Sequence, residues 1–325
     1  MNRTTHASLL GLLTLALALP AMAQVWPSKP VTVIIPTVAG GPIDSVSRSV
    51  ADKLRERYGQ PFVVENRPGA GGTIGATAVA KAAPDGYTIM FSIDPPIVVN
   101  PALLNPVPYD PVKDFAPVAL VADGGDVAVF VPAESGAKTA RQLADLMRAA
   151  PNSANYTTSG NGSPGHILAE LFRREAKFDA QHVPQKGAPQ ALTDLLAARV
   201  AYAVLPVSLV RPHVLSGKVR ALAVCADRRS PLMPEVPTVA EAGYPGFKGA
   251  HWWVIALAPA GTPKAITEAL NLEIRRIANS EEFKPVLERN GLVANQLTPA
   301  DTGERVKRDY AYWSALVKQL GIRPD

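Results

Sequence analysis

Three glycine-rich corners stand where the sequence changes from an apolar run to a helical pattern. They are Pro36-Thr-Val-Ala-Gly-Gly41, Arg67-Pro-Gly-Ala-Gly-Gly72 and Gly160-Asn-Gly-Ser-Pro-Gly165. Glycine lets the backbone turn sharply and approach a ligand with no Cβ in the way. The first N–H groups of a helix, together with its dipole, also bind anions. Each corner is therefore a candidate site for an anionic ligand, and the alternative for each is a tight turn without a ligand.

Asp44 complicates the first corner. It lies in the first turn of the helix that the pattern predicts over residues 43–58. Its carboxylate can accept hydrogen bonds from the same N–H groups that would hold a ligand. The second corner resembles a phosphate-binding loop, but it lacks the Gly-Lys-Ser/Thr sequence of a P-loop. Both corners stay open between a turn and the wall of a binding pocket.

The third corner matches the dinucleotide-binding pattern G-x-G-x-x-G, and Asp179 follows roughly twenty residues later, as in that fingerprint. Three observations argue against a nucleotide. The corner lies deep in the chain rather than in a first strand–helix unit. The preceding run Thr157-Thr-Ser159 is polar, and Asp179 comes before the next predicted strand instead of ending one. We therefore expect a loop for an anion or a polar ligand, and no cofactor.

Residue patterns for catalysis and metal binding are weak. Cys225 is the only cysteine and lies in a predicted buried strand, and the sequence has no H-E-x-x-H and no G-x-S-x-G. His166 opens a helix beside the third corner and can face a cleft, although a histidine there is more often a hydrogen-bonding surface residue. Trp252 and Trp253 are expected to pack in the core and at a hinge. We predict no catalytic residue and no metal site.

Composition and the first residues narrow the class of protein. The 325 residues carry a net charge of +5 that is scattered along the chain, with no basic stripe of the kind that binds nucleic acid. Residues 1–23 resemble a signal peptide, because an apolar run too short to span a bilayer precedes Ala21-Met-Ala23. Cleavage is expected after Ala23. A secreted chain with one cysteine forms no intrachain disulfide, which suits the bacterial periplasm.

Predicted strands and helices alternate from Val31 onward, and most strands are apolar runs typical of parallel strands covered on both faces. Two series of them predict two α/β lobes with mostly parallel sheets. The runs 119–131 and 247–259 are expected to cross between the lobes. The first lobe is then discontinuous, with residues 24–122 and 250–325, and residues 123–249 form the second. Such a body has a cleft over a hinge, where ligands bind at the carboxyl ends of strands.

One passage of the first lobe, DPPIVVNPALLNPVPYDPVKDFAP, is rich in proline and starts at Asp94. The density of prolines predicts that this passage crosses the surface between two strands.

A set of short motifs runs in order along nearly all of the chain after residue 23. The motifs are WPSKPVTVIIP, AGGPIDSVSR, GQPFVVENRPGAGGTIGA, AKAAPDGYT, NPALL, YDPVKDFAPV, GNGSPGHILAELF, KGAPQALTDLL, PHVLSGKVRALAV, VPTVAEAG and APAGTP. Together they resemble the substrate-binding proteins of tripartite tricarboxylate transporters, the TctC-like or Bug proteins of bacteria. No single motif decides the matter, but the set is highly specific.

The resemblance implies a periplasmic, type II-like "Venus flytrap" that closes on a small organic carboxylate and delivers it to a membrane permease of one large and one small subunit. In the family, backbone amides and ordered waters on two facing loops hold the carboxylate. Carried onto this chain, the implied ligand-binding residues are Thr37, Val38, Ala39, Gly40, Gly41, Asp44, Ser92 and Asp94 on one lobe, and Thr158, Ser159, Gly160, Asn161, Gly162, Ser163, His166, Gln185 and Leu205 on the other.

Three positions depart from the family pattern. Pro36-Thr-Val38 replaces a Pro-Phe-Pro or Pro-Phe-Ala, and Gln185-Lys-Gly187 replaces a Tyr-Lys-Gly. Leu205 stands where relatives commonly carry an aspartate in a strand-end loop. From Leu205 we form the hypothesis that the far end of the ligand is apolar or aromatic.

Two other functions stay open from the sequence. An extracytoplasmic enzyme acting on a carboxylated substrate could use His166 and Asp44 as acid and base. A sensory module could pass the closed state to a membrane kinase instead of a permease.

Overall fold

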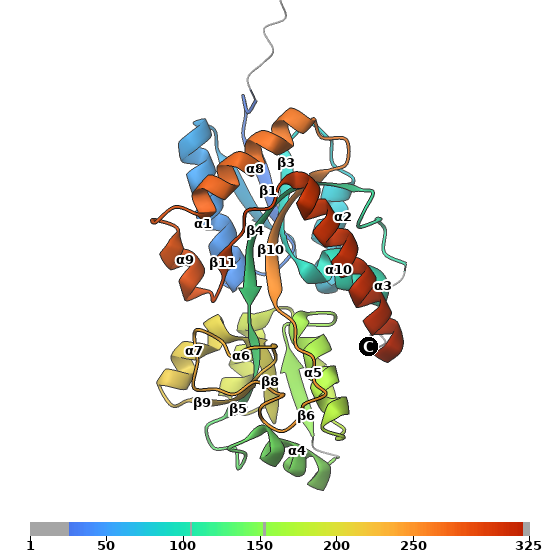
Figure 1. Ribbon diagram of the computed structural model, residues 1–325, viewed down its shortest axis with the longest axis vertical. Coiled ribbons are helices and arrows are strands. Elements are labelled where there is room, and N and C mark those ends of the chain that lie inside the picture. The colour runs from blue at the N-terminus through green and yellow to red at the C-terminus, as the bar shows by residue number, and fades with distance from the viewer. Residues whose placement is uncertain (1–25, 105, 152–153, 321–325) are drawn as a thin grey trace, which may run out of the picture.

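The chain folds into two lobes that are joined by two crossings, as Figure 1 shows. The computed structural model describes residues 26–320 except residues 105, 152 and 153, so the predicted signal peptide, residues 1–23, lies outside the described residues. One lobe is built on a six-stranded sheet and the other on a five-stranded sheet. We call them the six-stranded lobe and the five-stranded lobe.

In the six-stranded sheet, four strands run one way and two run the other way. The order is β11 (Val293–Ala294), β4 (Phe115–Gly125), β10 (Trp252–Pro259), β3 (Thr88–Ile93), β1 (Val31–Ile35) and β2 (Phe62–Asn66). β1 pairs in parallel with β2 and β3, while β10 runs antiparallel between β3 and β4. β11 runs antiparallel to β4 at the edge. The sequence did not predict this two-residue strand.

In the five-stranded sheet, one strand alone runs against the others. The order is β7 (Gln181–Pro184), β6 (Asn155–Thr158), β8 (Tyr202–Pro206), β5 (Val127–Pro132) and β9 (Val219–Val224). β6 pairs in parallel with β7 and β8, and β5 lies antiparallel between β8 and β9. The predicted fold class, two α/β lobes with mostly parallel strands, is confirmed.

Helices cover both faces of both sheets. In the six-stranded lobe, α1 (Pro42–Tyr58), α8 (Lys264–Ala278) and α9 (Lys284–Arg289) pack on one face, and α2 (Thr73–Ala80), α3 (Asn100–Leu103) and α10 (Pro299–Leu320) on the other. In the five-stranded lobe, α4 (Ala140–Ala149) and α5 (Pro164–Glu175) lie opposite α6 (Ala188–Leu196) and α7 (Val207–Leu215). None of these helices, nor any other among the described residues, has the length and hydropathy needed to cross a membrane.

The proline-rich passage differs from its prediction. Residues 94–101 are buried rather than on the surface, and they form a π-helical turn, η2 (Pro95–Val99), that runs into α3. The prolines stand in first-turn positions, where a missing N–H costs the helix no hydrogen bond. The apolar run Ile97-Val-Val99 packs in one cluster with Val306 and Trp313 of α10. Burial of this run outweighs the preference of proline for the surface.

The two crossings predicted from the sequence are present, and they pack against each other. The first passes from β4 through Asp126 into β5, and the second enters β10 at Trp252. A Cβ on Gly125 would lie 2.0 Å from Cε2 of Trp252, so only glycine allows this contact. His251 also joins the two crossings, since its Nδ1 lies 2.9 Å from Asp126 and its Nε2 lies 2.8 Å from Asp227. The bond to Asp126 outweighs burial and, with Asp227, raises the pKa of His251.

The tryptophans and the cysteine lie where the sequence predicts. Trp252 and Trp253 are buried, and Nε1 of Trp253 donates to Asp309 of α10 at 3.0 Å. Cys225 is fully buried directly after β9, and burial raises the pKa of its thiol. A buried thiol of this kind is unreactive.

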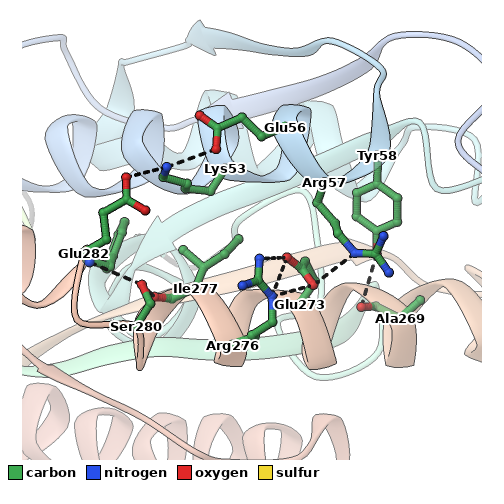
Figure 2. A network of polar contacts seen from close by, with 11 residues as sticks. Lys53, Glu56, Arg57, Tyr58, Ala269, Glu273, Arg276, Ile277, Ser280 and Glu282 are labelled. Atoms are coloured by element: carbon green, nitrogen blue, oxygen red, sulfur yellow. Dashed lines mark hydrogen bonds and ion pairs between the residues drawn. The ribbon is translucent and has the colours of Figure 1, made fainter.

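A polar network ties α1 to α8 on the outer face of the six-stranded lobe (Figure 2). Lys53 donates to Glu56 at 3.0 Å and lies 2.6 Å from Glu282. The buried carboxylate of Glu273 accepts two hydrogen bonds from Nε of Arg276, at 2.9 and 3.1 Å, and lies 3.6 Å from Arg57. The contact between Arg57 and Glu273 joins α1 to α8 near the C-terminus of α1, at the end opposite the first glycine corner.

Candidate ligand-binding site at the seam between the lobes

The first corner leaves the N-terminus of α1 without a side-chain cap. Gly41 is the N-cap residue in an extended conformation, no side chain bonds to the helix start, and Pro42 occupies the first turn. Asp44 instead accepts from the Gly40 N–H at 3.1 Å, from Nε of Arg48 at 3.0 Å and from Nδ2 of Asn66 at 2.9 Å. Asp44 therefore shapes the corner, and the first N–H groups of the helix have no intrahelical acceptor.

The charge state of Asp44 follows from these bonds. Burial raises its pKa, but the hydrogen bonds from Arg48, Asn66 and Gly40 outweigh burial and lower it overall. The carboxylate is thus ionised at neutral pH and fully occupied with its three neighbours.

The second corner is a packed wall rather than a free loop. Gly69, Ala70, Gly71 and Gly72 all have positive φ, between 47° and 118°, and the last three form a short 3-10 turn, η1 (Ala70–Gly72). A Cβ on Gly72 would lie 2.5 Å from Pro96 of η2 and 3.0 Å from the carbonyl oxygen of Pro36. Glycine at this position lets the second corner pack against both the first corner and η2.

The third corner is bonded mainly to itself. Ser163 caps α5 by accepting from the His166 N–H at 3.2 Å, and the Gly162 N–H donates to Nδ1 of His166 at 3.1 Å. The ring of His166 is buried and stacks on His182, with centroids 4.2 Å apart. Oγ1 of Thr158 lies 2.8 Å from Nε2 of His182. These contacts hold the loop in one shape.

The corners of the two lobes touch each other. A Cβ on Gly187 would lie 2.2 Å from Cγ2 of Val38, and a Cβ on Gly71 would lie 2.9 Å from the carbonyl oxygen of Asn161. We call this contact surface the seam. It is formed by Val38, Gly40, Gly71, Asn100 and Leu103 on the six-stranded lobe and by Asn161, Gly162, Gly187 and Pro189 on the five-stranded lobe.

Buried polar atoms at or beside the seam lack partners. Oγ1 of Thr37, Oδ1 of Asn100 and Oδ1 of Asn161 are buried, and no group of the described residues forms a hydrogen bond with any of them. Nearly all buried polar groups in proteins are hydrogen-bonded, so three exceptions on neighbouring segments need a reason. An uncapped helix start and unpaired oxygens together are features of a site for a small polar molecule. Within the described part of the chain, we find no cluster of three or more His, Cys, Asp or Glu side chains placed to hold a metal ion.

Comparison with known proteins settles the family. Residues 46–322 match the family model described as "Tripartite tricarboxylate transporter family receptor". The chain belongs to this family. It is 33% identical to the protein BugT of Bordetella pertussis over 326 residues, which covers 99% of each chain. It is also 36% identical over 298 residues to a UPF0065 protein of Pseudomonas sp. strain P51, covering 91% of this chain and 88% of that one.

Solved structures support the same assignment. Rpa4515 of R. palustris, solved with adipate, is 33% identical with a TM-score of 0.87, covering 92% of this receptor and 100% of that chain. MatC of Rhodopseudomonas palustris, solved with bound malate, is 33% identical with a TM-score of 0.84, and the match covers 90% of this receptor and 99% of MatC. The periplasmic binding protein BugD is 30% identical with a TM-score of 0.84, covering 92% and 100%.

In the structure of this receptor, the predicted site residues do not all lie at the seam. Those of the first and third corners, from Thr37 to Gly41 and from Thr158 to Ser163, lie on loops at or beside the seam. Ser92 is buried in β3 and donates to the carbonyl of Ile93. Gln185 follows β7, and its Nε2 donates to Asp194 at 2.6 Å.

Asp94 lies inside the six-stranded lobe. It is 1% exposed, and burial raises its pKa well above the usual value. The charged groups that act on it are Asp309 and Arg305 of α10 and Asp123 of β4, none of which belongs to the seam.

Leu205 differs from its prediction in place. It lies within β8 rather than in a strand-end loop, it is fully buried, and it belongs to a core cluster with Phe130, Leu192 and Val210. The hypothesis of an apolar ligand end therefore draws no support from Leu205. A Leu205→Asp change would bury an unpaired carboxyl group and would test the fold instead of the ligand.

Sequence reasoning missed Asn100 and Ile167. Asn100 begins the motif NPALL, to which the sequence assigns no contact with a ligand, yet its side chain contacts both lobes. Ile167 of α5 is fully buried in the apolar cluster of the six-stranded lobe, although its helix belongs to the other lobe. Helical spacing predicts that such an isoleucine is buried, but it cannot tell which lobe covers it.

Proposed function

We propose that this receptor is a periplasmic solute-binding protein that captures a small organic carboxylate at the seam and delivers it to a permease of one large and one small subunit. The observation that carries the proposal is the uncapped N-terminus of α1 beside the seam. A carboxylate there would accept hydrogen bonds from the helix start. The buried hydroxyl of Thr37, for which the described part of the chain offers no partner, lies in the same loop. Adipate and malate, found with two relatives, are both dicarboxylates.

The mechanism is closure. A ligand that touches both lobes stabilises the form in which they meet, and the permease would recognise that form. We take residues 24–122 with 250–325 as one lobe and residues 123–249 as the other, with the signal peptide cleaved after Ala23. The direct packing of the two crossings through Gly125 and Trp252 supports a hinge at this place.

The geometry favours binding over the alternative of acid–base catalysis by Asp44 and His166. A general acid or base works best with a pKa near the operating pH and with a free position toward the substrate. The pKa of Asp44 is lowered, and its carboxylate is already bonded to Gly40, Arg48 and Asn66. Nδ1 of His166 accepts from Gly162 within its own loop. Both side chains therefore act as supports of the corners.

The test is thermal melting of the chain from Gln24 onward with adipate, malate, other di- and tricarboxylates, aromatic acids and the amide of each acid. A ligand at 100 times its Kd adds about 2.7 kcal/mol to the free energy of unfolding, which moves the melting temperature by degrees. We expect a shift with one class of acid and none with its amide. A shift with the amide as well would contradict recognition of the carboxylate. Turnover of the acid, followed by chromatography, would favour an enzyme.

A further inference from the structure

Asn100 contacts glycines of both lobes at once. It lies where η2 gives way to α3, and its side chain is fully buried. Nδ2 donates to the carbonyl of Gly71 in the second corner at 2.7 Å. Because a carbonyl oxygen only accepts, this bond fixes which way the amide group points and turns Oδ1 toward Gly162 of the other lobe. None of the described residues donates to that Oδ1.

Only glycine fits at positions 71 and 162. A Cβ on Gly71 would lie 2.5 Å from Nδ2 of Asn100, and a Cβ on Gly162 would lie 2.0 Å from Oδ1 of Asn100. Real Cβ atoms do not approach other atoms this closely, because the overlap is repulsive. The same Cβ on Gly162 would lie 3.2 Å from Cδ2 of Leu103, a flexible side-chain end. The obstacle at Gly162 is therefore Asn100.

The segment that carries Asn100 is packed into the six-stranded lobe. Ile97, Val98 and Leu103 are buried in the same apolar cluster as Val306 and Trp313 of α10. Asn100 thus keeps its place in the six-stranded lobe when the other lobe moves. Its contact with Gly71 lies within one lobe and is independent of closure, whereas its contact with Gly162 exists only while the lobes meet.

We propose that Asn100 is the closure residue of this receptor, a side chain that Gly162 must accommodate before the lobes can meet. Closure removes water from Oδ1 of Asn100, and the captured molecule, or a water that it orders, then supplies the missing donor. This second part rests on the proposed function. The first part, the fit between Asn100 and Gly162, does not need a ligand.

A disulfide across the seam measures closure directly. The Cβ of Val38 lies 3.5 Å from the Cβ that Gly187 would carry, which is within the range of disulfides. In mild oxidant, a Val38→Cys/Gly187→Cys variant should therefore form a disulfide in those molecules whose lobes meet. Cys225 is fully buried and does not compete. The rate of cross-linking, followed by non-reducing electrophoresis without any added acid, then reports how often the seam forms.

Three further substitutions, made in the variant that carries the cysteine pair, test the role of Asn100 in closure. Gly162→Ala should slow cross-linking at least tenfold. Gly217→Ala is the matched control, since Gly217 has the same φ of +72° but no atom within 4 Å of its Cβ position. It should leave the rate unchanged. Asn100→Ala in the Gly162→Ala background should restore the rate, because it removes the atom that the new Cβ would strike.

The outcomes separate cleanly. Equal rates for Gly162→Ala and Gly217→Ala, or no recovery with Asn100→Ala, would overturn the proposal. So would a parent pair that never cross-links, because the seam itself would then not form. Circular dichroism of each reduced variant shows whether the lobes are folded. The cross-linking uses no carboxylate, so its failure is distinct from a failure of carboxylate capture in the melting experiment.

Discussion

The two ends of α1 differ in whether the polar groups around them have partners. Toward its C-terminus, Lys53 is paired with Glu282, and Glu273 of α8 is paired with Arg276 (Figure 2). At its N-terminus, no side chain of residues 26–320 described above caps the helix, and none of their groups bonds to the buried Oγ1 of Thr37 in the preceding loop. One helix thus joins a region whose polar groups satisfy each other to a region whose polar groups do not.

The two regions have different roles in the protein. Paired groups within one lobe contribute equally whether the lobes are open or closed, so they set the stability of the fold. Unpaired buried groups cost free energy, roughly 1–3 kcal/mol each, unless something outside the chain pairs with them. We therefore expect changes in the paired region to alter stability without altering ligand binding, and changes at the seam to do the reverse.

The largest effect is expected at Asp44, which lies at the seam end of α1 but is fully paired. Asp44→Ala removes the acceptor of Gly40, Arg48 and Asn66. We expect a loss of about 2 kcal/mol in the free energy of unfolding at pH 7, since one partner, Arg48, is well exposed. We also expect a loss of binding of at least tenfold, because the first corner loses its shape. Urea unfolding and calorimetric titration with the acid from the melting panel measure the two effects.

The pH dependence of this difference is a control. The pKa of Asp44 in the folded protein is lowered from its usual 3.8. Its stabilising contribution is therefore present above about pH 3.8 and disappears as the pH falls through the lower, folded-state pKa. The gap in stability between the parent and Asp44→Ala should narrow below that pH. A gap that stays constant down to pH 2 would show that the lost carboxylate is not the cause.

A smaller effect, on stability alone, is expected at Glu273. Its carboxylate is buried, but its partners Arg276 and Arg57 are both largely exposed. Glu273→Ala should lower the free energy of unfolding by about 1 kcal/mol and the melting temperature by about 2–4 °C. The Kd for the acid should not change. Glu282→Ala is the matched change on an exposed partner of Lys53 and should leave both quantities unaltered.

The sequence predicts the two regions unequally well. Apart from the two-residue β11, the strands of both sheets follow from local apolar patterns, and the main helices lie where the patterns place them. The segment from Asp94 to Pro101 is a second exception, because its prolines suggest the surface while its position under α10 buries it. The glycine corners are visible from residue types, since few other residues allow such turns.

The contacts across the seam could not be predicted from the sequence. Asn100 and Gly162 are far apart in the chain and belong to different lobes, so no local period connects them. Leu205 shows the same limit in reverse: its place at the end of a strand suggests a loop, but its neighbours in the core come from α6 and α7. Which buried polar group lacks a partner is a property of the assembled structure alone.

The smallest effect on stability is expected at Thr37, where the change should act on binding alone. Thr37→Val keeps the shape of the side chain and removes a hydroxyl that has no hydrogen-bond partner among the described residues. Stability should be unchanged or slightly higher, because replacing an unpaired buried hydroxyl with a methyl group removes a cost. Binding of the acid should weaken about tenfold, or 1.4 kcal/mol, if the hydroxyl bonds to the ligand. Thr302→Val is the control, since Oγ1 of Thr302 is also buried with no partner in the described structure but lies in α10. Calorimetric titration of both variants should show weaker binding of the acid for Thr37→Val and unchanged binding for Thr302→Val. Equal affinity in both would mean that the unpaired hydroxyl beside the seam serves the ligand no more than the one in α10 does.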